Sequence, residues 1–391
     1  MTAAPDPVAL LQDLIACPSV TPAEGGALSL LERVLGAAGF ACHRLTFSEP
    51  GTPDVDNLFA RLGTGRPHLC FAGHTDVVPP GEDRLWRHPP FAGIIEDGIV
   101  YGRGACDMKG SIAAFAVAAI GFAGEHREAL PGSISLLITG DEEGPAVNGT
   151  AKVLGWLKEH GEVPDHAIVG EPTCPDKLGD SVKIGRRGSL HFRITADGVQ
   201  GHSAYPEKAD NPIPPLARLI DRVASARLDE GNAHFDPSTL AVTGFDVGNG
   251  ANNVIPARAV ARLNIRFNNE HTPESLMAWV EAHCAAVSAD LGGRFAIETI
   301  ESASCFVTAP GPLVEVVCAA IAAETGLTAK LNTSGGTSDA RFIKDFCPVV
   351  EFGPVNQTIH QADENIAVAD LTALTRVYAT VLKRYFAAIG P

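Results

Sequence analysis

The sequence predicts an α/β fold with a mostly parallel sheet, into which an α+β ferredoxin-like domain is inserted. In the first part of the chain, short apolar runs alternate with helical patterns, which is typical of a parallel sheet covered by helices on both faces. The middle part shows half-exposed strands in the order β-α-β-β-α-β. Helices and buried strands return after Pro310. We therefore expect a main domain formed by residues 1–180 and 295–391, with residues 181–294 inserted.

Each element of the main domain follows from a local pattern. Asp6 can cap a helix that has Pro7 at its first position and Leu10, Leu11 and Leu14 on one face. Short apolar runs predict buried strands, and longer runs with helical spacing predict helices. We expect strands at residues 68–72, 134–138, 166–169 and 349–352, and helices at residues 109–124, 150–160, 313–325 and from 370 onwards.

The inserted domain is expected from strands in which polar and apolar residues alternate. These strands lie at residues 190–194, 240–245, 260–267 and, as the last of the order, 295–300. Gly248-Asn249-Gly250 supplies turn residues between the second and third strands. Helices at residues 214–226 and 272–291 complete the order.

The composition favours a protein that acts on a small molecule. The chain has 391 residues and a net charge of −16, and no run of Lys or Arg is longer than two. Proteins that bind nucleic acid normally carry a basic stripe, so no nucleic-acid partner is expected. The longest apolar run, residues 112–123, is too short to span a bilayer and predicts a buried helix rather than a membrane segment.

The cysteines and the N-terminus indicate a cytoplasmic protein. The nine cysteines are odd in number and form no C-x-x-C pair, which argues against a disulfide framework and against a zinc site of thiolates. The first residues include Asp6 and Asp13 but no basic stretch, so they are unlike a signal peptide.

Acidic and imidazole side chains follow several predicted strands of the main domain. His74 follows the first strand, the Asp141-Glu142-Glu143 run follows the second, Glu171 follows the third, and His360 follows the C-terminal one. Open α/β sheets bind ligands at the carboxyl ends of their strands, so these groups are expected to converge at one edge. Asp107 joins them from a position just before a predicted helix.

Two histidines and three carboxylates without a thiolate suit zinc or another divalent metal. One carboxylate can bridge two metal ions, and we assign that role to Asp107. We expect one imidazole and one further carboxylate for each ion, from His74, His360, Glu143 and Glu171.

Asp76 and Glu142 are expected to act beside these ligands. Asp76 lies two residues beyond His74 and suits an acceptor for the imidazole N–H. Glu142 can take a proton from the attacking water and pass it to a leaving nitrogen. Taken singly, each motif has a plain structural reading, since Asp107 can cap the following helix and His360 can be an exposed loop residue. Their joint occurrence after separate strands favours the metal site.

Five runs resemble the di-zinc metallopeptidase family that includes carboxypeptidase G, aminoacylase and acetylornithine deacetylase. They are residues 73–81, 101–104, 107–110, 141–144 and 170–172, in the order of the family. The resemblance implies a zinc-hydrolase catalytic domain with two Zn²⁺ ions per subunit, which Co²⁺ is expected to be able to replace. It also implies a cis peptide between Asp107 and Met108. Cys106 stands where the family usually has alanine, and a thiol there could make the site sensitive to oxidation.

Three further runs indicate the substrate. Residues 185–189, 252–256 and 335–342 resemble the branch of the family that hydrolyses N-succinyl-L,L-2,6-diaminopimelate to succinate and L,L-2,6-diaminopimelate, in lysine and diaminopimelate biosynthesis. This substrate carries three carboxylates, which arginine side chains hold well, although each arginine could instead pair with a neighbouring acid. The candidate substrate-binding residues are Arg186, Asn252, Arg266, Gly336, Thr337, Arg341 and Asn356.

His202 resembles the family histidine that reaches the active site of the other subunit. The resemblance implies that it stabilises the oxyanion of the reaction, and its plain alternative is a surface loop histidine. The inserted domain is expected to act as a dimerisation or lid domain, because an edge strand and helix faces can pair with a copy of themselves. We therefore expect a homodimer.

Two alternatives stay open. Acetylornithine deacetylase and aminoacylase share the metal motifs, and residues 185–189 and 335–342 are the argument for the succinyl substrate. A metal-binding protein that has lost catalysis is the second alternative, against which the presence of Glu142 argues. The chain has no G-x-S-x-G elbow, so a serine hydrolase is disfavoured.

Overall fold

The computed structural model describes residues 4–126 and 129–389, and the chain divides into two compact units. The first unit comprises residues 1–184, 308–332 and 338–391, and the second comprises residues 185–307 and 333–337. Each unit has a sheet of its own. The predicted fold class, a mostly parallel α/β sheet with an inserted α+β module, is confirmed.

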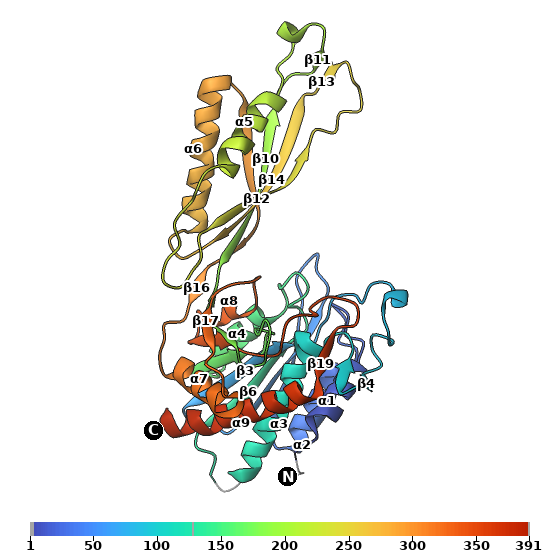
Figure 1. The fold of residues 1–391 in the computed structure, drawn as a ribbon, viewed down its shortest axis with the longest axis vertical. Coiled ribbons are helices and arrows are strands. Elements are labelled where there is room, and N and C mark those ends of the chain that lie inside the picture. The colour runs from blue at the N-terminus through green and yellow to red at the C-terminus, as the bar shows by residue number, and fades with distance from the viewer. Residues whose placement is uncertain (1–3, 127–128, 390–391) are drawn as a thin grey trace. The chain divides into compact units, whose positions relative to one another are not determined.

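The first unit is built on an eight-stranded sheet in the order β1-β2-β6-β3-β7-β18-β8-β17 (Figure 1). Strands β6, β3, β7 and β18 run parallel to one another, and the sheet turns antiparallel on both sides of them. The strands are β1 (Ala41–Phe47), β2 (Val55–Leu62), β3 (His68–His74), β6 (Ser133–Thr139), β7 (His166–Val169), β8 (Ser181–Lys183), β17 (Lys330–Asn332) and β18 (Val349–Glu351).

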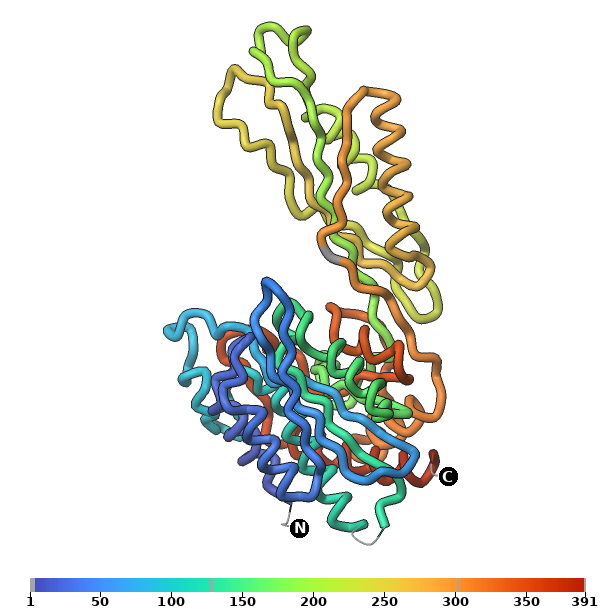
Figure 2. The backbone as a smooth tube through the Cα atoms, turned by 180° about the vertical axis from the view of Figure 1, so that it is seen from behind, coloured from blue at the N-terminus to red at the C-terminus, as the bar shows by residue number. Residues whose placement is uncertain are grey.

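Helices cover both faces of this sheet, as the strand register shows. Phe71 of β3 stacks on Phe115 of α3 and contacts Tyr378 of α9, so α3 and α9 lie on one face (Figure 1). Phe59 of β2 points to the opposite face and contacts Trp156 of α4. Helix α4 therefore lies on that second face, which Figure 2 shows from behind. The helices of the unit are α1 (Pro7–Ile15), α2 (Ala27–Ala37), α3 (Gly110–Glu125), α4 (Thr150–Glu159), α7 (Pro312–Thr325), α8 (Ala340–Ile343) and α9 (Val368–Ala388).

Two predictions about local structure are confirmed in this unit. The Asp6 side chain accepts a hydrogen bond from the backbone N–H of Val8 at 3.1 Å and caps α1, which has Pro7 at its start. The apolar run of residues 112–123, for which a buried helix was expected, lies in α3 and is mostly buried. By length and composition, Ala105–Glu125 is long and apolar enough to cross a membrane, but 94% of its apolar window is buried inside the protein.

Short elements connect this sheet to the loops that carry the site. A small sheet pairs β19 (Asn365–Ala367) with β5 (Ile99–Tyr101), and β5 with β4 (Ile94–Glu96). A 3-10 turn, η1 (Asp83–Leu85), precedes them, and an irregular helical turn, η2 (Ala105–Lys109), leads directly into α3.

The second unit has the predicted β-α-β-β-α-β order. Its four-stranded antiparallel sheet runs β12-β14-β10-β15, and α5 and α6 lie side by side on it (Figure 1). The apolar side chains of β10 and β14 alternate with polar ones and pack against the two helices, so that one face of the sheet is buried. The elements are β10 (Gly188–Asp197), α5 (Ile213–Ala224), β12 (Thr239–Asp246), β14 (Arg258–Phe267), α6 (Pro273–Leu291) and β15 (Arg294–Ala303), with the short β9 (Gly185–Arg186), β11 (Gly201–His202), η3 (Pro206–Lys208), β13 (Val254–Ile255) and β16 (Phe306–Val307).

The expected end of the inserted domain at residue 294 is too early. Strand β15 pairs along β10, and β16 pairs with β9, so both belong to the sheets of the second unit and the chain returns to the first unit at residue 308. The five residues 333–337 also belong to the second unit, which the sequence did not indicate. The start of the insert, expected at residue 181, lies four residues later.

Candidate active site

Three neighbouring parallel strands deliver most of the candidate ligands. His74 is the last residue of β3 and pairs with Thr139, the last residue of β6. The turn that carries Glu142 and Glu143 follows β6, and Glu171 follows β7 on the other side of β3. Because these strands run the same way, their carboxyl ends meet at one edge, as expected for an open α/β sheet.

Asp107 reaches this edge from η2. The backbone is not helical at Asp107 and Met108, and the peptide between them is cis, as the resemblance implied. Asp107 as a whole is 8% exposed. The sequence alternative, in which Asp107 caps the following helix, does not describe this turn, because α3 has no side-chain cap.

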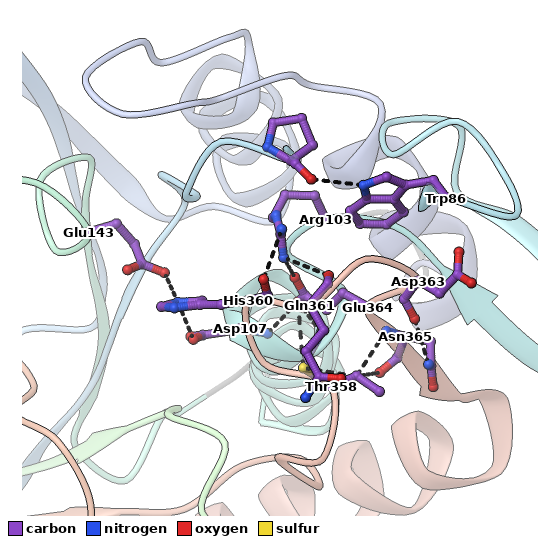
Figure 3. A network of polar contacts seen from close by, with 12 residues as sticks. Trp86, Arg103, Asp107, Glu143, Thr358, His360, Gln361, Asp363, Glu364 and Asn365 are labelled. Carbon is purple, nitrogen blue, oxygen red and sulfur yellow. Dashed lines mark hydrogen bonds and ion pairs between the residues drawn. The ribbon is translucent and has the colours of Figure 1, made fainter. Parts of the chain in front are cut away.

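The two oxygens of the Asp107 carboxylate are divided between two histidines. Oδ1 lies 3.2 Å from His74 Nε2. Oδ2 lies 3.4 Å from His360 Nε2 (Figure 3). His360 Nε2 also lies 2.7 Å from Glu143 Oε1, and His74 Nε2 lies 3.8 Å from Glu171 Oε1. The carboxylate of Asp107 therefore joins two sets of groups.

Each of these sets can hold one ion. In the set His74, Asp107 and Glu171, and in the set Asp107, Glu143 and His360, one ligand atom from each residue lies within 4.8 Å of the others. This is the division expected from the sequence, with one imidazole and one carboxylate on each side of Asp107. We refer to them as the first group (His74, Asp107, Glu171) and the second group (Asp107, Glu143, His360).

Glu142 lies beside both groups. It forms a third set with His74 and Glu143 whose ligand atoms also lie within 4.8 Å of one another. Burial and the neighbouring charge of Glu171 raise the pKa of Glu142 well above its ordinary value. A carboxylate with a raised pKa is suited to proton transfer near neutral pH.

Asp76 contacts His74 differently from our expectation. His74 Nδ1 donates to the backbone carbonyl of Asp76 at 2.8 Å, while the Asp76 carboxylate lies 3.7 Å away. That carboxylate instead accepts the backbone N–H groups of Glu142 and Glu143, at 3.3 and 3.0 Å. Asp76 therefore sets the tautomer of His74 through its main chain and holds the turn of the two glutamates through its side chain.

The electrostatics of the cluster are dominated by its carboxylates. Burial alone would lower the pKa of His74, but the hydrogen bond with Asp107 and the charge of Glu142 raise it well above the ordinary value. Hydrogen bonds with Asp107 and Glu143 raise the pKa of His360 to about 10. Burial would raise the pKa of Asp107, but hydrogen bonds with His360 and His74 lower it instead. The site is therefore built to favour positive charge.

This donor set fits two divalent cations. Its atoms are imidazole nitrogens and carboxylate oxygens, with no thiolate among them, which suits zinc and similar metals. His74 Nδ1 is already engaged by a carbonyl, which leaves Nε2 as its ligand atom.

Comparison with known proteins gives the family. The profile of the peptidase family M20/M25/M40 matches residues 70–384. The chain belongs to this family. Proteins named succinyl-diaminopimelate desuccinylase from Rhodospirillum centenum and Methylobacterium nodulans are 59% and 58% identical to it, over 99% and 98% of this chain and 99% and 96% of theirs.

The M20 fold is also found among solved structures. The YXEP protein of Bacillus subtilis, described as a dinuclear metal binding peptidase from the M20 family, superposes with a TM-score of 0.71 at 17% identity, over 96% of both chains. At this identity the likeness shows the fold of the M20 chain and not its substrate.

Two of the expected substrate-binding residues lie in the first unit of this M20 chain. The guanidinium of Arg341 lies 4.6 Å from the centre of the ring of its neighbour Phe342. Burial raises the pKa of the Asp339 carboxyl, and the charge of Arg341 opposes this with a smaller, lowering effect. Asn356 lies four residues before His360, and its backbone N–H donates to the backbone carbonyl of Cys174 at 2.9 Å.

The other expected substrate-binding residues, and His202, lie in the second unit. Arg186 is 6% exposed and donates to the carbonyl of Gly336 at 2.8 Å, so the structure brings these two together beside Thr337. Arg266 lies on the sheet face away from α5 and α6 and donates to Asn264 at 3.1 Å. Asn252 and His202 are exposed.

The expectation that Cys106 makes the site sensitive to oxidation finds no support in its surroundings. The thiol is fully buried, and burial together with the charge of Glu364 raises its pKa well above the ordinary value. Oxidation requires an accessible thiolate.

Sequence reasoning missed two residues that contact this site. Arg103 and Glu364 are 2% and 0% exposed and form an ion pair at 2.6 Å, directly behind Asp107 and His360 (Figure 3). Arg103 lies within a run that resembles the family, which was the one available signal. Nothing in the sequence distinguishes Glu364 from its neighbour Asp363.

Proposed function

We propose that this chain is a succinyl-diaminopimelate desuccinylase. It would hydrolyse N-succinyl-L,L-2,6-diaminopimelate to succinate and L,L-2,6-diaminopimelate. The observation that carries the proposal is the 54–59% identity, over nearly the full length, to proteins of that name, together with a site whose carboxylates and imidazoles could hold metal ions.

We propose two Zn²⁺ ions as the cofactors, one for each group around Asp107, with Co²⁺ able to replace them. Such ions polarise a scissile carbonyl and lower the pKa of the attacking water. His74 and Glu171 would hold one ion, His360 and Glu143 the other, and Asp107 both. Asp76 keeps His74 in the tautomer that presents Nε2.

Glu142 would be the general base and then the general acid. It is close to the ligands, as the third set of potential ligand atoms shows, but is not needed to complete either group around Asp107. It can remove a proton from the attacking water and return it to the nitrogen that leaves with diaminopimelate. Positive charge beside it would lower its raised pKa towards the range in which a carboxylate accepts a proton.

The cationic side chains would recognise the three carboxylates of the substrate. Arg186, Arg266 and Arg341 provide the charge, and Asn252, Gly336, Thr337 and Asn356 provide polar contacts. Arg186 and Gly336 already form one unit through their hydrogen bond, which would present the guanidinium and the 333–337 loop together.

We further propose a cytoplasmic homodimer that forms through the second unit. Strand β12 is an edge strand and exposes Val242 and Phe245, and the edge strand β15 exposes Ile300. Exposed apolar side chains on edge strands favour pairing with another copy. His202 of one subunit would then stabilise the oxyanion in the other. The nine cysteines are odd in number and form no C-x-x-C pair, which suits a reducing compartment.

One assay tests the function. Succinate release from succinyl-diaminopimelate is compared with acetate release from acetylornithine, each with and without a chelator. We expect chelator-sensitive release of succinate. Faster turnover of acetylornithine would favour the alternative deacetylase, and no hydrolysis of either by the metal-loaded protein would favour a binding protein without catalysis.

A further inference from the structure

A buried ion pair lies behind the second group. Arg103, in the loop between β5 and η2, donates to Glu364 Oε2 at 2.6 Å, and Glu364 is fully buried (Figure 3). Neither residue belongs to the groups of potential metal ligands. A buried ion pair is costly to desolvate and is weak evidence for stability alone, so its partners show what else it does.

Glu364 fixes the main chain at Asp107. Its second oxygen, Oε1, accepts the backbone N–H groups of Cys106 and Asp107, both at 3.1 Å. The residue that both groups share is therefore held by its own main chain. This contact lies within the irregular turn η2, where regular helical hydrogen bonds do not fix the backbone.

Arg103 fixes the main chain at His360. Its guanidinium donates to the carbonyls of His360 at 3.4 Å and of Gln361 at 3.3 Å, in addition to Glu364. The ring of Trp86 lies over it at 5.2 Å and is itself anchored by a hydrogen bond to the carbonyl of Pro80 at 2.9 Å (Figure 3). The planar fork of an arginine is suited to contacting several acceptors at once, which a lysine cannot do.

The loop that carries His360 needs such support. His360 and Asp363 have φ angles of +60° and +59°, which side chains other than glycine adopt with difficulty. Backbones of this kind persist only where the surrounding contacts over-determine them. In this loop, Arg103 donates to the carbonyls of His360 and Gln361, and Glu364 is the residue directly after Asp363.

We propose that the Arg103–Glu364 pair is a positioning device for the second metal ion. It connects the main chain of Asp107 to that of His360 and so sets the distance between two of the three ligands in the second group. The inference rests on the proposed two-metal site and adds to it two residues that determine how tightly the second ion is bound.

The first group does not depend on the pair to the same degree. His74 belongs to β3, which pairs on both sides with β6 and β7, and its ring is oriented by the carbonyl of Asp76. Glu171 lies two residues beyond the end of β7. Only Asp107 is shared. Disturbing the pair is therefore expected to weaken the second ion selectively.

Stepwise binding of Zn²⁺ to the purified full-length protein tests this, with chelator competition to resolve the two dissociation constants. In Arg103→Lys, which keeps the charge opposite Glu364 but loses the fork, we expect the second Kd to rise about 10- to 100-fold and the first to change less than about 3-fold. The double variant Arg103→Met with Glu364→Gln removes both charges of the pair. It is expected to show the same selective weakening of the second ion.

The matched control is Arg61→Met. Arg61 is a residue of β2 that forms an ion pair with Glu162, and its side chain is 13% exposed. Its removal therefore tests the loss of a partly buried ion pair away from the site. Both its Zn²⁺ constants should stay at the wild-type values. Cobalt spectra give a second readout, because the absorption that appears with the second equivalent of Co²⁺ should change in the Arg103 variants, while that of the first equivalent is retained.

Three outcomes are distinguishable. Selective weakening of the second ion in folded variants supports the proposal. Equal weakening of both ions, or wild-type constants and cobalt spectra, overturns it and makes the pair an ordinary structural contact. If the wild-type protein itself takes up fewer than two ions, the proposed two-metal site fails instead.

Discussion

The carboxylate of Asp76 accepts the backbone N–H of Glu143 at 3.0 Å. Through this hydrogen bond, the segment after β3 holds the turn that follows β6. Asp76 follows β3, whereas Glu143 follows β6. The other carboxylate oxygen accepts the N–H of Glu142 at 3.3 Å. One side chain thus holds both the candidate base and a candidate ligand, while its main-chain carbonyl orients His74.

Replacing this carboxylate should reduce turnover more than it reduces metal binding by the first group. An asparagine has only one carbonyl oxygen, so Asp76→Asn must lose one of the two N–H contacts. The carbonyl bond to His74 is main chain and remains. We expect kcat to fall about 10- to 100-fold while at least one ion stays bound, measured by steady-state kinetics and metal analysis.

Asp141→Asn is the matched control. Asp141 accepts the N–H groups of Val147 and Asn148 at the same turn, but both on one oxygen, Oδ2, at 2.8 Å. An asparagine can keep both contacts there, so the loss of activity should be clearly smaller. Equal losses in the two variants would show that the division of oxygens in Asp76 is unimportant.

The elements and ligands that sequence reasoning found are those with a local signal. Buried strands such as His166–Val169 contain short apolar runs, and the polar residue after each run must lie at the strand end. Since parallel strands end at one edge, His74, Glu143 and Glu171 could be placed together without coordinates. The position of His202 relative to them was inferred from resemblance alone.

The features that sequence reasoning missed depend on main-chain geometry. The acceptor for His74 is a carbonyl, which every residue has, so no side-chain pattern marks it. Glu364 acts on the N–H groups of residues more than 250 positions away, and its role appears only after the chain has folded. Strand β15 was predicted at residues 295–300, but its pairing with β10, which places it in the second unit, is a tertiary contact.

Metal content should respond to each group separately. His360→Ala leaves the first group complete and is expected to retain one ion per chain, whereas Asp107→Ala disturbs both groups and should retain less than one. Equilibrium dialysis against Zn²⁺ followed by elemental analysis measures this. Two tightly bound ions in His360→Ala would contradict the assignment of the second group.

Glu142→Gln separates proton transfer from metal binding. The amide has nearly the same size but cannot accept and return a proton, so kcat should fall about 100- to 10,000-fold with two ions still bound. Glu159→Gln, an exposed residue at the end of α4, controls for the loss of one negative charge. A fully metallated Glu142→Gln enzyme with near-normal turnover would remove Glu142 from the mechanism.

His68 should make the first unit less stable in mild acid. It is fully buried, its Nε2 lies 2.7 Å from Ser135 Oγ, and burial lowers its pKa to about 3. The unfolded chain has a histidine pKa near 6.5, so between about pH 3 and 6.5 it binds more protons than the folded one, and stability falls as the pH falls. From pH 6 to pH 5 this amounts to about 1 kcal/mol.

Urea unfolding of the metal-free protein at the two pH values measures this effect. In His68→Gln the decrease from pH 6 to pH 5 should be smaller by that amount, whatever the overall stability of the variant. The exposed His160→Gln should keep the wild-type decrease. An unchanged pH dependence in His68→Gln would show that this histidine is not held neutral.

His202 should act on the active site of the partner subunit if the second unit forms the dimer. It is exposed and lies on the short strand β11, which follows β10, and its Nδ1 accepts the N–H of Ala204 at 3.0 Å. An oxyanion donor contributes about 2.7–4 kcal/mol, or roughly 100- to 1,000-fold in rate.

His202→Ala and Glu142→Gln should each be inactive alone, yet regain activity when mixed. In half of the sites of each mixed dimer, an intact His202 from the Glu142→Gln chain meets an intact Glu142 from the His202→Ala chain. Subunit exchange is followed independently by mass spectrometry, so that exchange without any return of activity would refute the cross-subunit role.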